Sequence, residues 1–396
     1  MLTALGGIDL LRVPVAVREA LRLGAYQILF LDRVPSYAAV SDSVSLARRA
    51  SARAAGFANA VLRKVAASGW ETFAQLSEGD DPASLAIRYS TPRWLVDLLL
   101  DELGRDLAEA AMGASCDPPE RCLRVNRRRA TPEQARASLA GEGVALVPVD
   151  GFPDALVVTA GPAIETTKAF AGGLVTPQSR GSQLVSTVAC GGSPGARGVV
   201  DLCAAPGGKL SHLADLLLDA HLYACEIDPV RAGRMRRNLA RLGVQAEVIA
   251  GDATDLAGRL EPNFDLVLLD APCSGLGVLA SRPDLRWRRG AGSAGEHALT
   301  EERLLAAGAA LVAPGGSLTY AVCTLTRRET VDVLAKLLDG GEWQADDLGA
   351  EFPHCRHPDD GRFLLTVPGV HGSSGVFIAR LRRATRRVTR GSMGPR

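Results

Sequence analysis

The chain has 396 residues, 47% of them hydrophobic, and its 45 Lys and Arg nearly balance 44 Asp and Glu, so it can bury two or three domain cores without a charge typical of nucleic-acid binding. Its apolar runs are too short for a membrane span, Asp9 and Arg12 interrupt the apolar stretch that a signal peptide needs, and the eight cysteines form neither a CxxC pair nor a disulfide framework. These features disfavour membrane, zinc-cluster and disulfide-rich secreted proteins, and we expect a soluble, cytoplasmic monomer without a metal.

The first third of the chain favours helices. Apolar side chains recur at roughly helical spacing over 18–64, with a break at Asp32–Pro35, which predicts a small helical domain. A polar, proline-bearing link is expected over Asp80–Pro92, and an amphipathic helix over Trp94–Met112. The stretch Cys122–Val144 predicts a strand, an arginine cluster and a second helix.

The arginine cluster has two interpretations. Arg124, Asn126 and Arg127–Arg129 stand at a strand end, where they can contact RNA phosphates. A solvated charged turn gives the same pattern, and the residues alone favour that turn. Across the chain only four of the 45 basic residues are lysines, a bias that suits phosphate binding but also follows from a GC-rich genome.

From Ala171 onward, short apolar runs alternate with amphipathic stretches, which is typical of an α/β fold with a doubly wound, mainly parallel sheet. The expected strands are Gly198–Cys203, Leu222–Glu226, Ala246–Ala250, Asp265–Asp270, Ser317–Cys323 and Gly375–Arg383. The expected helices are Leu210–Leu218, Val230–Leu242, Thr300–Val312 and Glu329–Leu338. The basic, glycine-bearing tail over 385–396 is expected to be disordered.

The sequence VVDLCAAPGGKLS, Val199–Ser211, joins a strand to a helix through small residues, which lets a ligand approach the backbone N–H groups at the helix start. It is not a Walker loop, because Cys203 stands where that loop needs glycine and Leu210 follows Lys209. The absence of a GxGxxG motif argues against a dinucleotide oxidoreductase. The turn therefore predicts a different nucleoside ligand.

Three carboxylates, Glu226, Asp252 and Asp270, each close a successive predicted strand behind this turn. In open α/β sheets, ligands bind beyond the carboxyl ends of the strands. Glu226 is suited to accept from both hydroxyls of a ribose, and Asp252 from an adenine amino group. The ligand we infer is S-adenosylmethionine.

The stretch DLVLLDAPCSGLG, Asp265–Gly277, predicts a buried strand that delivers Asp270 and Cys273 to the same edge, and Cys323 ends the following strand. Such a cysteine pair can form a disulfide or merely fill space. The functional alternative is methylation of a pyrimidine at carbon 5, which becomes nucleophilic only when a thiolate adds at carbon 6. A second group must then remove the carbon-5 proton, while Asp270 can bond to the N3 and amino edge of the base.

Several strings of the sequence carry a family resemblance. DLCAAPGGK, DAPCSGLG, SRPDLRW and TYAVCTLT, in this order and spacing, resemble the RsmB/Sun (Fmu) branch of RNA 5-methylcytosine methyltransferases in the NOL1/NOP2/Sun family. The resemblance implies a class I Rossmann-like methyltransferase sheet over 171–384. It also implies a small α+β RNA-binding region over 79–170, where LRVN precedes the basic run, and a truncated NusB-like helical domain over 1–78, which contains AYQILFLDRVP. Half of such a helical bundle should leave apolar faces uncovered.

The resemblance also implies roles for residues of the site. Cys323 is the nucleophile that attacks a cytosine of 16S rRNA, and Cys273 is the thiol for proton removal or product release. The methyl donor is held by Cys203, Ala204, Ala205, Pro206, Gly207, Gly208, Lys209, Glu226, Asp252 and Asp270. A transfer-RNA substrate and a non-catalytic RNA-binding or ribosome assembly factor remain the alternatives.

The chain departs from the family pattern at four places. Val322 replaces the usual Thr before the nucleophile, and Glu226 replaces the usual Asp. Ser179 replaces the acid of the VQDxAS string, and Ser374 begins a segment where Asp-Gly-Phe is expected. Both catalytic thiols are retained, so these changes bear on substrate positioning rather than on the covalent chemistry.

Overall fold

The structure is a computed structural model that describes residues 2–7, 9–261 and 263–385. The chain forms two compact units, Met1–Val96 and Asp97–Arg396. The predicted tail over 385–396 lies outside the described residues, except for Thr385. No helix among the described residues is long and apolar enough to cross a membrane.

The first unit is helical, as the spacing of its apolar residues predicts. Its core includes Leu21 and Leu62, both fully buried, whereas Tyr26, Phe30 and Trp70 are exposed, in line with the expected uncovered apolar face. The predicted link over Asp80–Pro92 is wrong in part, because a short helix forms there with its first N–H groups capped by an aspartate. The helices are α1 (Leu2–Gly6), η1 (Leu10–Arg12), α2 (Val15–Phe30), α3 (Ser36–Ala50), α4 (Ala54–Ser77) and α5 (Pro82–Arg88).

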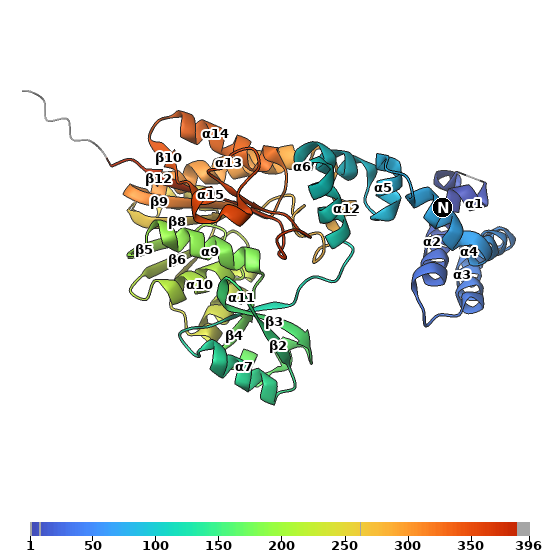
Figure 1. The fold of residues 1–396 in the computed structure, drawn as a ribbon, viewed down its shortest axis with the longest axis horizontal. Helices are drawn as coiled ribbons and strands as arrows, with labels where there is room; N and C mark the ends of the chain where they lie inside the picture. Colours follow the sequence, from blue (N-terminus) through green and yellow to red (C-terminus); the bar gives the residue numbers. More distant parts are fainter. Residues whose placement is uncertain (1, 8, 262, 386–396) are drawn as a thin grey trace, which may run out of the picture. The chain divides into compact units, whose positions relative to one another are not determined.

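The second unit begins with α6 (Arg93–Ala114), which is kinked at Gly104, and contains a small antiparallel sheet in the order β2-β3-β1-β4 (Figure 1). A capping box between Thr131 and Gln134 starts the helix α7 at the predicted position. The elements of this region are β1 (Cys122–Val125), α7 (Pro132–Gly141), β2 (Ala145–Val149), β3 (Phe152–Ala160), η2 (Ile164–Thr166), α8 (Lys168–Ala171) and β4 (Val175–Pro177). Since β4 pairs with β1, the small sheet includes a strand from beyond residue 170.

Two residues of the arginine cluster do not face solvent, so the prediction that they contact RNA phosphates is wrong. Arg124 is buried, forms an ion pair with Asp215, and donates to Gln178 Oε1 at 2.6 Å and to Ser211 Oγ at 2.7 Å. Asn126 donates to the backbone oxygens of Gly173 and Leu242, each at 2.8 Å. The physical reason is that both side chains form hydrogen bonds with buried polar groups of the helices α10 (Gly208–Leu216) and α11 (Pro229–Leu242), which pack against the larger sheet. The remaining three arginines, Arg127–Arg129, are exposed.

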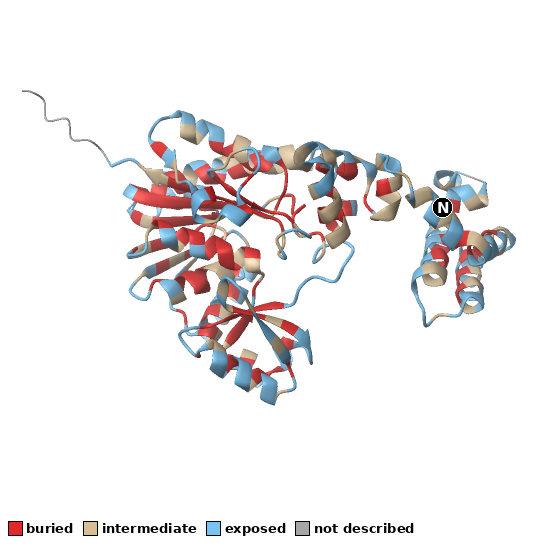
Figure 2. Ribbon diagram, viewed as in Figure 1, coloured by how far each residue is buried: buried red, intermediate tan, exposed pale blue. Residues whose placement is uncertain are grey.

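The larger sheet has the order β10-β12-β9-β8-β5-β6-β7, with β11 paired to β12. Strands β5 to β9 run parallel to one another, whereas β12 pairs antiparallel with β9, β10 and β11. This is the predicted α/β fold, and Figure 2 shows its strands as the most deeply buried part of the unit. The strands are β5 (Gly198–Asp201), β6 (His221–Glu226), β7 (Glu247–Ala250), β8 (Phe264–Asp270), β9 (Val312–Val322), β10 (Trp343–Ala345), β11 (Leu364–Thr366) and β12 (Val376–Arg383).

Helices cover both faces of this sheet (Figure 1). Leu266 and Leu268 of β8 join the core beneath α9 and α10, whereas Val267 between them lies against Gly308 of α13, as alternation along a strand requires. The helices are α9 (Arg180–Gly192), α10 (Gly208–Leu216), α11 (Pro229–Leu242), η3 (Ala253–Gly258), α12 (Leu285–Arg288), α13 (Ser293–Leu311), η4 (Arg327–Glu329), α14 (Val331–Asp339), α15 (Leu348–Glu351) and η5 (Pro353–Cys355).

His212 of α10 predicts how the fold responds to acid. Burial, and secondarily the charge of Arg124, lower the pKa of His212 from 6.5 to about 3. Below pH 6.5 His212 is therefore protonated in the unfolded chain but not in the folded one. The free energy of unfolding decreases by about 1.4 kcal/mol for each unit by which the pH is lowered in this range. We expect His212→Leu to flatten the stability curve between pH 6.5 and pH 4 in urea unfolding followed by circular dichroism. Parallel curves for the two proteins would contradict this assignment.

Candidate active site

The turn between β5 and α10 is built as the sequence predicts. Gly207 is the residue before α10 and has φ +95°, in the left-handed region that favours glycine. A Cβ there would also approach Leu239 and Met235 of α11 to 3.2 Å. The small residues Cys203–Pro206 lead from the strand into this turn, so backbone rather than side chain borders the edge of the sheet.

A cavity of about 750 Å³ opens at the carboxyl ends of the central strands. It is lined from the strand ends and from α13, on which Thr300, Arg303 and Leu304 face it. Half of the predicted donor-binding residues line the cavity: Cys203, Ala205, Glu226, Asp252 and Asp270. The others, Ala204, Pro206, Gly207, Gly208 and Lys209, form the adjoining turn without lining it.

The carboxylates at this cavity fit a nucleoside. Glu226 is 3% exposed, and its carboxylate lies 3.3 Å from the Arg231 guanidinium and accepts from the Asp228 N–H at 3.0 Å. Asp252 accepts from the N–H and hydroxyl of Thr254, and the backbone N–H first of all lowers its pKa. Both groups therefore offer fixed acceptors for hydroxyl or amino donors of a ligand.

Asp270 is held by a lysine from the turn. Lys209 Nζ donates to Asp270 Oδ2 at 2.6 Å, and this ion pair is about one-third exposed on the Asp270 side. Next to it lies Asp201, the last residue of β5, which the sequence reasoning missed although it ends a strand as Asp270 does. Burial first, and then the charge of Asp270, raise the pKa of Asp201 to about 7.

The two predicted catalytic thiols meet. Cys273 lies just after β8, Cys323 just after β9, and their Sγ atoms are 3.1 Å apart. Both cysteines are free, so the disulfide alternative is not what the structure has. Gly277 N donates to Cys323 O at 3.0 Å and holds the loop after β8 beside the end of β9.

The protonation of this pair is asymmetric. The hydrogen bond between the two thiols lowers the pKa of Cys323 despite its burial; of the nearby charges, Asp270 raises this pKa and Lys209 lowers it. The same hydrogen bond, followed by burial, raises the pKa of Cys273. By contrast, burial first, and then the charges of Glu226 and Asp252, raise the pKa of Cys225 to about 11, which makes it an inert thiol. Cys323 is thus the sulfur that loses its proton first.

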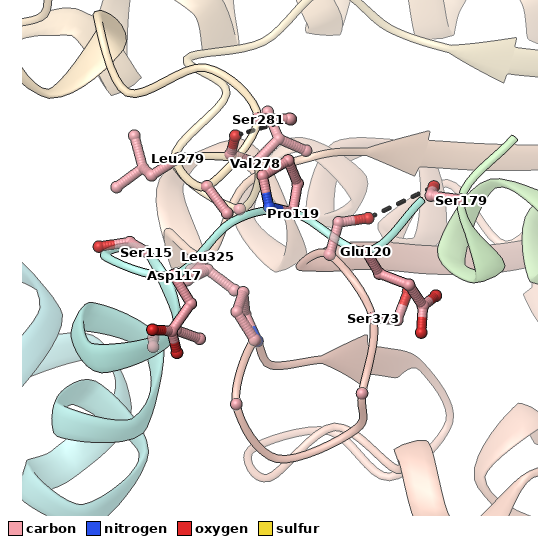
Figure 3. A pocket seen from close by; sticks show the side chains of 18 of the residues that line it. Ser115, Asp117, Pro119, Glu120, Ser179, Val278, Leu279, Ser281, Leu325 and Ser373 are labelled. Atoms are coloured by element: carbon pink, nitrogen blue, oxygen red, sulfur yellow. Dashed lines mark hydrogen bonds between the residues drawn. The ribbon is translucent and has the colours of Figure 1, made fainter. Parts of the chain in front are cut away.

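A second cavity, of about 380 Å³, is lined by residues that include Val278, Leu279 and Leu325 (Figure 3). In the loop after β8, Asp270–Pro272 line the first cavity and Leu276–Ser281 line the second. Cys273 lies in the short stretch of chain between these two groups of residues. Ser179 and Ser374, two of the departures from the family pattern, both line the second cavity, with their hydroxyls 3.5 Å apart. The described residues contain no cluster that could hold a metal ion.

Comparison with known proteins agrees with this site. The model of the 16S rRNA methyltransferase RsmB/F family matches residues 194–382, the NusB family matches 2–67, and a ferredoxin-like domain of the RsmF/B type matches 91–165. A probable ribosomal RNA small subunit methyltransferase B of Bacillus subtilis is 32% identical over 94% of this chain and 84% of its own. Ribosomal RNA small subunit methyltransferase B of Pseudomonas putida is 34% identical over 92% and 82%.

Solved structures agree with the predicted fold. PH0851 superposes with a TM-score of 0.78 at 25% identity and covers 96% of this chain and 85% of its own. A methyltransferase homologue from Pyrococcus horikoshii superposes with a TM-score of 0.67 at 27% identity, over 77% and 99% of the two chains. These relatives and the arrangement of the site establish that the chain belongs to the RsmB/F family of 16S rRNA methyltransferases, which use S-adenosylmethionine.

Proposed function

We propose that this protein methylates carbon 5 of a cytosine in 16S rRNA through a covalent intermediate on Cys323. The observation that carries the proposal is the 3.1 Å contact between Cys323 and Cys273, whose pKa values are shifted in opposite directions. Cys273 follows β8, whose end lines the cavity with Glu226 and Asp252, and Cys323 follows the neighbouring strand β9. The small-subunit rRNA methyltransferases among its relatives favour rRNA over tRNA as the substrate.

The covalent step follows from the chemistry of the base. The Cys323 thiolate adds to carbon 6, and the electrons of the 5,6 double bond make carbon 5 nucleophilic. S-adenosylmethionine supplies an electrophilic methyl group. Loss of the carbon-5 proton then lets the bond between carbon 6 and Cys323 break, which restores the double bond. Cys273 is placed to accept the carbon-5 proton, because its sulfur contacts that of Cys323. It keeps its own proton while Cys323 attacks and releases that proton to solvent before this last step.

Asp270 and the donor-binding residues have separate tasks in this proposal. Asp270, whose Oδ2 accepts a hydrogen bond from Lys209, accepts from the amino group of the cytosine rather than donating to N3. Glu226 accepts from the ribose of the donor, Asp252 from its adenine, and the Cys203–Lys209 turn approaches it through backbone. The substrate base must be unstacked to reach these groups, and Arg127–Arg129 are exposed to contact phosphates.

The experiment that tests this function uses donor labelled on its methyl group. Unmodified 16S rRNA and unmodified tRNA are incubated separately with the protein, and the RNA is then digested to nucleosides. The proposal predicts label in 5-methylcytidine from 16S rRNA. Label found only in nucleosides from tRNA would show that tRNA, the alternative substrate, is the one that the protein methylates. Binding of rRNA without label at any protein concentration would make it a non-catalytic factor.

Glu226→Gln should weaken binding of the methyl donor while leaving the chemical step intact. The amide keeps the shape but removes the charge, and hydrogen bonds to charged groups contribute about 1.5–3 kcal/mol. We therefore expect KM for S-adenosylmethionine to rise by about tenfold to a hundredfold with kcat changed much less. Initial rates at varied donor concentration check this, with Glu247→Gln, a replacement of the exposed glutamate in β7, as the matched control. An unchanged KM would remove Glu226 from the donor site.

A further inference from the structure

A buried carboxylate that the proposed chemistry does not use is hydrogen-bonded to the residues that follow the two cysteines. Glu329, the last residue of η4, is fully buried. Its Oε1 accepts from the N–H of Ser274 at 2.6 Å. Its Oε2 is 2.7 Å from the Ser274 hydroxyl, 3.0 Å from that of Thr324 and 2.8 Å from that of Thr326. Both oxygens act as acceptors, which is what an ionised carboxylate provides.

These partners connect Glu329 to both reacting loops. Ser274 directly follows Cys273, and Thr324 directly follows Cys323. One buried side chain therefore ties together the residues next to both sulfurs, and the Ser274 and Thr324 hydroxyls are themselves 2.9 Å apart. The backbone of Glu329 is fixed in turn, because the buried Tyr320 of β9 donates its hydroxyl to Glu329 O at 2.7 Å.

A second buried glutamate, Glu301 of α13, clarifies the charge of this group. Neither of its carboxyl oxygens has a hydrogen-bond partner among the described residues, and its side chain is fully buried. Burial first, and then the charge of Glu329, raise the pKa of Glu301 to about 9. Glu301 is therefore neutral near pH 7, and the negative charge behind the thiols is that of Glu329.

Charged groups act on both thiols. The Asp270 charge raises the pKa of Cys323 and the Lys209 charge lowers it, so this ion pair acts on Cys323 in both directions. Arg289 donates to the backbone oxygens of Cys273 and Ser274 at 3.3 and 3.0 Å. The Glu329 charge raises the pKa of Cys273, the sulfur that keeps its proton.

We propose that Glu329 is a positioning residue, whose carboxylate holds the Cys273 and Cys323 loops in contact and keeps the shared proton on Cys273. This inference rests on the proposed roles of the two cysteines. It assigns the reactivity of Cys323 to a group that touches neither the RNA base nor the methyl donor. Small displacements of a reacting group lower rates strongly, on the order of a hundredfold for 1 Å.

The test measures which sulfur reacts in the absence of RNA and donor. The full chain is treated briefly with iodoacetamide across pH 6 to 10, and the label on each cysteine is quantified by peptide mass spectrometry. We expect Cys323 to be alkylated first in the natural protein, and Glu329→Gln to reduce its preference over Cys273 by about tenfold. In the methylation assay we expect kcat to fall by about tenfold or more with KM for the donor unchanged.

Glu301→Gln is the matched control, because it replaces an already neutral buried carboxyl with a neutral amide and should leave both readouts within about twofold. If Glu329→Gln does not fold, Ser274→Ala carries the test, since it removes one hydroxyl donor and should lower the preference by about threefold. An unchanged alkylation preference in the folded variant overturns the inference. Alkylation that changes as expected in a protein that methylates no RNA would sustain the role of Glu329 and reject the proposed function instead.

Discussion

Cys323→Ala should lower methyl transfer by about four orders of magnitude or more and leave no covalent protein–RNA complex, because the variant has no sulfur to add to carbon 6. Cys273 cannot take over this role, since burial and the charge of Glu329 still raise its pKa in the variant. Methyl incorporation into rRNA and denaturing gel electrophoresis of the reaction mixture measure the two effects.

Cys273→Ala should behave in the opposite way and accumulate protein on RNA. Addition of Cys323 to the base slows without the hydrogen bond to Cys273 but still occurs, whereas completion of the reaction needs the second sulfur. The covalent complex should therefore appear as a slowly migrating band in a denaturing gel. Cys190→Ala, which removes a thiol outside the site, should show neither effect. A Cys273→Ala variant that is fully active and runs free of RNA would reject the assigned roles.

The second large effect concerns the ion pair between Arg124 and Asp215. Arg124→Ala should destabilise the protein by about 3–5 kcal/mol, because it leaves a buried carboxylate without its partner. Burial lowers the pKa of Arg124 and raises that of Asp215, so the cost of removing both charges from water exceeds their attraction. Urea unfolding measures the loss.

Two further variants separate charge pairing from packing. Arg127→Ala, at a half-exposed arginine 3.2 Å from Asp154, should cost less than about 1 kcal/mol. Replacing both members of the buried pair, by Arg124→Met with Asp215→Leu, should recover most of the stability that Arg124→Ala loses. A double variant as unstable as the single one would show that the ion pair is not the source of the effect.

The sequence predicts the central strands β5 to β8 well, because each is a short, mainly apolar run that ends in, or is followed by, an acidic or glycine residue. The first and last residues of the helices and strands are harder to predict from the sequence. Strand β9 begins at Val312 rather than Ser317, since Gly315, at φ +81°, breaks the alternation that marks a strand. Helix α13 begins at Ser293 rather than Thr300, because its first turns contain few apolar residues.

The buried polar residues are what sequence patterns miss. Arg124 is 91 positions from Asp215, so nothing local distinguishes an inward guanidinium from a phosphate-binding one. Glu329 and Ser274 are 55 positions apart and meet only because β8 and β9 are neighbours. The two cysteines are predictable as a pair from their strand ends, but their different pKa values depend first on the hydrogen bond between them, then on burial and on nearby charges such as Lys209 and Glu329.

The most direct measurement is tandem mass spectrometry of the complex that Cys273→Ala forms with rRNA. After digestion by nuclease and protease, the account predicts a single cytidine attached through carbon 6 to the sulfur in the peptide that contains Cys323. A nucleotide on any other residue would contradict it. So would methylated cytosine produced by the variant without any protein-linked nucleotide.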